Sequence, residues 1–239
     1  MQTRTRAIGA ACGLAVLIGA IGAIGTAGAD DAKAAYPAMA PIGQYLMSSQ
    51  ADEIALARSA APAAIADDAE VLTLGTHGYE TAAKGKNGFV CMVWRSWTAG
   101  FDDPQFWNPK LRAPVCLNAA AVRTVLPADI ERTKWALAGV SRADMLARTR
   151  AAVAANKFTL PAPGAMSYMM SKQGYLGDTV GHWHPHVMFF VARTDSGAWG
   201  ANLGGSPVID AQDDHDPTTT FFVLVPKWSD GTPAVTEHH

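Results

Sequence analysis

The order of strand-like and helix-like segments limits the fold of this chain more than any other feature of its sequence. Segments with strand-like composition lie at 71–74, 79–84, 89–95, 182–191, 207–210 and 218–225. Patterns typical of helices lie at 48–59, 127–138, 142–155 and 165–172. The two kinds do not alternate strictly, so a repeated parallel βαβ arrangement is disfavoured. We predict a single α+β domain with a largely antiparallel sheet and inserted helices.

Local signals mark some element boundaries. Asn87-Gly88 lies between two strand-like segments and predicts a β-hairpin that joins them. Ser141, followed by Asp144, predicts the capped start of the helix 142–155. Pro127 suits the first turn of the helix 127–138.

The first 29 residues have the features of a secretory signal peptide. Arg4 and Arg6 precede an apolar run from about residue 7 to 24, and small residues before Asp30 form a cleavage site. A membrane anchor is the alternative, but the run is near the minimal length and rich in Gly and Ala. We predict a signal peptide over 1–29, a flexible leader over 30–47 and one domain over 48–239, with no membrane span after cleavage.

The charge of the chain argues against a nucleic-acid partner. The mature chain keeps 17 basic and 21 acidic side chains, a formal net charge of −4. A nucleic acid would need a clustered basic face, and no run of Lys and Arg supplies one. A small-molecule partner is compatible with the sequence, which does not define an oligomeric state.

Cys91 and Cys116 are the two cysteines that remain after cleavage of the signal peptide. An even pair in an oxidising compartment is most simply a disulfide, and the pair lacks the C-x-x-C spacing of zinc sites. Closing a loop of about 26 residues would stabilise the fold by about 3.5 kcal/mol on the chain-entropy model. We predict this disulfide and a periplasmic or extracellular location; a free or metal-bound pair is the alternative.

Three histidines alternate in the segment from Gly181 to His186, directly before an apolar run. In an extended strand, His182, His184 and His186 project from one face, which they share with Met188 and Phe190. Neighbouring histidines then have Cα atoms about 6.6 Å apart, and the outer two are about 13 Å apart. One ion with bonds of about 2.0 Å therefore fits two neighbours, whereas all three need a bend at Pro185.

We therefore predict a transition-metal site built from His182 and His184 with help from His186 or the distant His215. Zinc is the first choice, and iron or copper are alternatives. Met166, Met169 and Met170 could serve copper, but methionines at helical spacing more often form core packing. The alternative for the histidines is a structural role at the end of a strand or in solvent.

If the site is catalytic, the ion would activate water for hydrolysis, with a nearby carboxylate as general base. Asp178 and Asp214 are the candidate bases because they lie just upstream of the histidines and beside His215 in the sequence. Whether the protein is an enzyme stays open at this point.

The loop 94–107 is rich in aromatic residues and offers a second hypothesis, a non-catalytic module that binds a ligand or partner. Trp97 and Trp107 would stack on the ligand in that case. Burial of these rings over the sheet is the favoured alternative. A third hypothesis is a structural envelope protein with no small-molecule site.

Three motifs in the chain resemble a group of uncharacterised exported bacterial proteins. They are Asn87-Gly88-Phe89-Val90-Cys91, Gly181-His182-Trp183-His184-Pro185-His186 and Trp228-Ser229-Asp230-Gly231-Thr232. The resemblance would cover most of the mature chain, and it implies an exported single domain without implying an activity.

Overall fold

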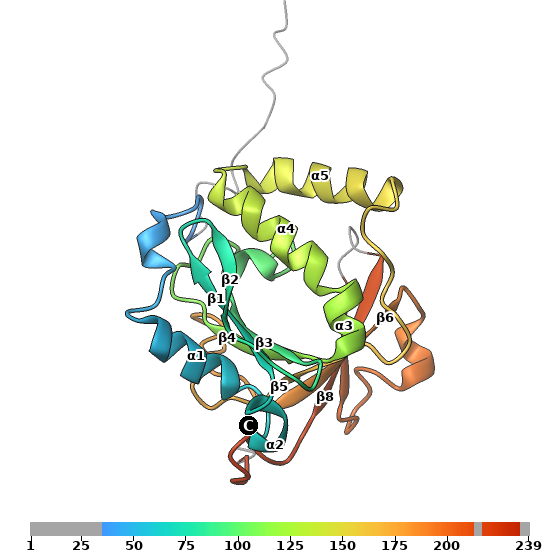
Figure 1. Ribbon diagram of the computed structural model, residues 1–239. Helices are drawn as coiled ribbons and strands as arrows, with labels where there is room; N and C mark the ends of the chain where they lie inside the picture. The colour runs from blue at the N-terminus through green and yellow to red at the C-terminus, as the bar shows by residue number, and fades with distance from the viewer. Residues whose placement is uncertain (1–34, 213–216, 235–239) are drawn as a thin grey trace, which may run out of the picture.

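The computed structural model describes residues 35–212 and 217–234. Its eight strands form one sheet in the order β2-β1-β3-β4-β5-β6-β8-β7, and all neighbouring strands are antiparallel except β1 and β3 (Figure 1). The single α+β domain with a largely antiparallel sheet is therefore confirmed. The strands are β1 (Glu70–Gly75), β2 (Gly78–Ala83), β3 (Val90–Trp94), β4 (Ala113–Leu117), β5 (Met166–Met169), β6 (His186–Ala192), β7 (Val208–Gln212) and β8 (Thr218–Leu224).

The predicted hairpin at Asn87-Gly88 is wrong. β2 pairs with β1, and β3 lies on the other side of β1, parallel to it. The connection between β2 and β3 therefore crosses the start of β1, and Lys86 N donates to Asp68 O at 2.8 Å there. Gly85 permits this crossing, because a Cβ at that position would lie 2.1 Å from the backbone nitrogen of Glu70.

Two helices, α1 (Gln50–Arg58) and α2 (Ala63–Ala66), cover one face of the sheet (Figure 1). The capped helix expected over 48–59 is confirmed, since the Ser49 side chain accepts a hydrogen bond from Asp52 N. Small side chains of α1, α2 and the residues that directly follow each helix pack on inward-facing residues of β1, β3 and β4, which brings helix and sheet close together. These small residues are Ala57, Ala60, Ala61, Ala66 and Ala69.

The opposite face of the sheet is covered by α3 (Ala119–Thr124), α4 (Leu126–Leu137) and α5 (Arg142–Ala154) (Figure 1). Both predicted helices in this region are confirmed. Pro127 lies in the first turn of α4, and the Ser141 side chain caps α5 by accepting from Asp144 N at 3.1 Å. The predicted helix over 165–172 is wrong, because its core is β5, which fills the gap between β4 and β6.

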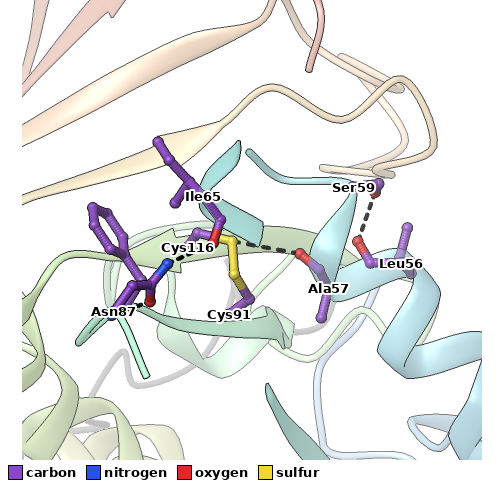
Figure 2. The surroundings of a disulfide bond; sticks show 8 residues. Leu56, Ala57, Ser59, Ile65, Asn87, Cys91 and Cys116 are labelled. Carbon is purple, nitrogen blue, oxygen red and sulfur yellow. Dashed lines mark hydrogen bonds between the residues drawn. A yellow bond between two sulfur atoms is a disulfide. The ribbon is translucent and has the colours of Figure 1, made fainter. Parts of the chain in front are cut away.

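The predicted disulfide joins Cys91 and Cys116, which face each other across β3 and β4 with Cα atoms 4.0 Å apart. Both cysteines are fully buried beneath α1, where the carbonyl oxygen of Ala57 lies 3.7 Å from Cys116 Sγ (Figure 2). Nearby, Asn87 Nδ2 donates to the carbonyl of Ile65 at 2.8 Å and so ties the β2–β3 connection to α2. The disulfide thus lies in the core between the helices and the sheet.

The segment 35–47, which we expected to be part of a flexible leader, packs against the domain. Tyr45 is fully buried, its ring centroid lies 4.9 Å from that of Trp97, and its hydroxyl donates to Trp107 O. An aromatic cluster forms around this contact and joins the segment to α4 and α5. The predicted signal peptide and residues 30–34 lie outside the described residues.

None of the helices within 35–212 and 217–234 is long and apolar enough to cross a membrane.

Candidate functional site

A cavity of about 490 Å³ separates the sheet from α4 and α5. Its floor is the sheet face on which alternate residues of β3 to β8 project, and its roof is formed by one side of each helix. The sheet curves beneath these helices, and α3 closes one side (Figure 1). This volume lies in the range that small-molecule sites occupy.

Apolar groups dominate the floor of the cavity. Met188 and Phe190 of β6 are buried, and Phe222 of β8 lies opposite Met188 in the register. The other apolar floor residues are Trp94, Ala113, Met169 and Ala211. In the roof, Ala128 of α4 and Val153 of α5 face the same space.

The cavity wall carries equal numbers of positively and negatively charged side chains. Two arginines, Arg95 and Arg132, and two acids, Asp103 and Asp129, line it together with six threonines. Arg95 is paired with Glu53 at 2.8 Å, with both side chains buried. The wall therefore offers hydroxyls and apolar surface rather than an excess of one charge.

Arg132 is held against the wall by contacts of its own. Its guanidinium lies 4.3 Å from the ring centroid of Phe101, and its nitrogens donate to the carbonyl oxygens of Thr98 and Ala99. A guanidinium over an aromatic face is attracted by the negative charge of that face. These contacts order the wall beside α4.

His186 is the imidazole that borders the cavity. It is 2 % exposed, and its ring packs 4.8 Å from Trp183 and 5.4 Å from Phe222, measured between ring centroids. Its Nδ1 lies 2.7 Å from the carbonyl oxygen of His184, so Nδ1 carries the proton and donates it. Burial lowers the pKa of His186 below its ordinary value and outweighs the hydrogen bond to the His184 carbonyl, which raises it, so the neutral ring is favoured at neutral pH.

β6 begins at His186, four residues after His182, so His186 is the member of the motif that lies on the strand. Pro185 lacks an N–H donor and Gly181 has a φ of 57°, so the chain joins the sheet only after the proline. The shared face expected for His186, Met188 and Phe190 is present in β6. His182 and His184 lie before the strand and are exposed.

The predicted metal site is not assembled within 35–212 and 217–234, where no group of three His, Cys, Asp or Glu side chains is arranged to hold an ion. The three histidines do border one small pocket beside the large cavity, together with Ser171 and Met169. His215 and Asp214 lie outside the described residues, so the ligand set that includes His215 stays a prediction.

Asp178, the other candidate base, lies on the surface away from the cavity wall. It accepts hydrogen bonds from the hydroxyls of Tyr175 and Tyr36, and Lys110 Nζ lies 3.2 Å from it. These contacts lower the pKa of Asp178 to about 2. A carboxylate with such a low pKa is a weak general base near neutral pH.

The rings of the aromatic loop are buried, as the favoured interpretation of the sequence predicted. Trp97 is fully buried and its Nε1 donates to Thr133 Oγ1 at 3.0 Å, while Trp107 is 5 % exposed. Stacking of a ligand on these two rings is therefore excluded by their place in the core. The start of the loop contributes instead through Trp94 and Thr98, which line the cavity.

Sequence reasoning missed the roof of the cavity. Asp129, Arg132 and Thr149 lie on helices that the sequence predicts correctly, but their spacing matches no known motif. The polar residues on the inward side of these helices are the one sequence feature that could have indicated the cavity.

None of the family models, curated proteins or solved structures compared with the chain matches it.

Proposed function

We propose that this protein is an exported binding protein for a small, uncharged and largely apolar molecule, which it holds in the cavity between the sheet and α4 and α5. The observation that carries the proposal is the cavity itself. The space of about 490 Å³ is partly open to solvent and lined mainly by apolar side chains. Small-molecule sites have this size and a mostly apolar lining with a few polar groups.

The chemistry of the wall supports the same proposal. Thr149 is 7 % exposed, and its hydroxyl has no hydrogen-bond partner among the described residues. A buried hydroxyl without a partner costs stability, and a molecule bound beside it would supply one. The wall carries two arginines and two acids without an excess of one charge, which favours an uncharged molecule over an ion.

The disulfide supports the exported part of the proposal. Disulfides persist in oxidising compartments and are rare in the cytosol. The Cys91–Cys116 bond is buried in the core, where it shares contacts with α1, β3 and β4. Determining the N-terminal residue of the mature protein from its native host tests cleavage after Ala29.

The binding test uses N-phenyl-1-naphthylamine, an uncharged apolar dye that becomes fluorescent in apolar surroundings. The wild-type protein should bind it saturably. Val153→Trp places a large ring in the cavity and should weaken the affinity by at least about tenfold, a loss of about 1.4 kcal/mol.

The matched control is Ala154→Trp, one residue further along α5 and exposed. It adds the same ring to the same helix and should leave the affinity unchanged. Equal affinities of the two variants, or no saturable binding by the wild type, would contradict the proposal.

A metal site at the histidines is a second candidate function, favoured by the small pocket that His182, His184 and His186 share. His186 donates through Nδ1, which leaves Nε2 as its available ligand atom. Elemental analysis of tag-free mature protein should then give about one zinc per chain, and the double variant His182→Ala/His184→Ala should lose it. Metal-free wild-type protein whose thermal stability does not respond to added zinc sinks this candidate and leaves the cavity proposal intact.

A further inference from the structure

The imidazole of His186 determines which hydrogen-bonding group a ligand in the cavity needs. Its side chain borders the cavity from the end of the floor where β6 begins. Nδ1 is committed to the carbonyl of His184, and no described residue forms a hydrogen bond with Nε2. In the neutral ring with the proton on Nδ1, Nε2 is an acceptor with an open lone pair.

Aromatic rings surround this acceptor. Trp183 and Phe222 pack against the His186 ring, and the two rings lie 5.7 Å from each other in an edge-on arrangement. Met188 continues the apolar floor from there. Aromatic side chains at such distances favour a further flat ring placed edge-on or offset against them.

The cations of the wall argue against an acidic ligand. Arg95 is neutralised by Glu53 inside the protein. Arg132 is engaged by two backbone carbonyls and the ring of Phe101. An anion would therefore lose its hydration without gaining an uncommitted cation in exchange.

From these observations we infer that the ligand is an uncharged hydroxylated aromatic molecule whose hydroxyl donates a hydrogen bond to His186 Nε2. The inference rests on the proposed cavity function and makes His186 the residue that determines specificity. Loss of the hydroxyl would leave a buried acceptor unsatisfied, which is how a polar site rejects an analogue that lacks the group.

The test compares 2-naphthol with 2-methoxynaphthalene, which keeps the ring and the oxygen but cannot donate. Both are measured by displacement of N-phenyl-1-naphthylamine at neutral pH. Wild-type protein should prefer 2-naphthol by about fivefold or more, the effect of one net hydrogen bond of about 1 kcal/mol. His186→Phe should bind both ligands equally, and His186→Gln, which retains an acceptor, should keep part of the preference.

The control variant is His77→Phe, which changes an exposed histidine in the turn between β1 and β2 and should leave the preference intact. Equal affinity of the wild type for the two ligands, failure of both to displace the dye, or an undiminished preference in His186→Phe overturns the inference. If His186→Phe does not fold, the affinities of the wild-type protein for 2-naphthol and 2-methoxynaphthalene still test the inference. Saturable dye binding that is lost in Val153→Trp separates failure of this inference from failure of the cavity proposal.

Discussion

At the scale of single residues, the ion pair of Glu53 and Arg95 ties α1 to the end of the sheet. Arg95 is fully buried and Glu53 is 2 % exposed. The guanidinium donates to Glu53 Oε1 and to the carbonyls of Tyr45 and Val93, while Leu74 N donates to the same carboxylate oxygen. A charge pair removed from water needs such hydrogen bonds to replace its lost hydration.

Glu53→Gln should destabilise the protein by about 3 kcal/mol or more, because it leaves the Arg95 charge buried without a counterion. Urea denaturation followed by far-UV circular dichroism measures this change. The control is Asp68→Asn, which breaks the exposed pair of Asp68 and Lys86, 3.0 Å apart. That change should cost less than about 1 kcal/mol; an equal loss in the two variants would contradict the role given to the buried pair.

The sequence of the histidine motif predicts part of its arrangement. Alternation correctly places His186, Met188 and Phe190 on one face, because strand periodicity fixes that relation. It does not place His182 and His184, because the chain before Pro185 is not extended along the ladder. The tautomer of His186 depends on the His184 carbonyl, a contact that no spacing rule predicts.

At the scale of elements, the crossing of the β2–β3 connection over the start of β1 sets the strand order at one end of the sheet. Gly85 lies against the backbone of residues 68–70 at this crossing. A side chain there has no space, because its Cβ would lie 2.5 Å from the carbonyl carbon of Ala69 as well. The parallel pairing of β1 and β3 therefore depends on a glycine.

Gly85→Ala should destabilise the protein by about 1 to 3 kcal/mol, the usual cost of forcing atoms into a packed region. Gly43→Ala is the control, since a Cβ at that position meets no atom within 4 Å. It should change the free energy of unfolding by less than about 1 kcal/mol. Thermal and urea denaturation measure the free energy of unfolding of the two variants. Equal values would disprove the close crossing.

Local chemistry explains which elements the sequence predicts. α1 and α5 begin at serine caps, and α4 has a proline in its first turn. A few neighbouring residues therefore determine where these helices begin. β4 is buried at all five positions and shows no alternation, and Met166, Met169 and Met170 mimic helical spacing in and just after the four-residue β5. Whether such segments form strands or helices is determined by pairing with strands that are distant in the sequence.

At the scale of the whole molecule, the protein is a sheet with two different faces. Small side chains bring α1 and α2 close to one face, over the disulfide. On the other face α4 and α5 lie further from β6 and β8, and the space between them is the cavity. Under the proposed function, the closely packed layer over the disulfide stabilises the domain, and the layer with the cavity gives room for a ligand.

A crystal structure of the wild-type protein with 2-naphthol shows directly whether the cavity holds a hydroxylated aromatic ring. We predict electron density for the naphthalene ring between the sheet and α4 and α5, with the hydroxyl about 2.8 Å from His186 Nε2. Density for 2-naphthol on the outer surface alone, with the cavity free of it, would contradict both the cavity function and the role of His186.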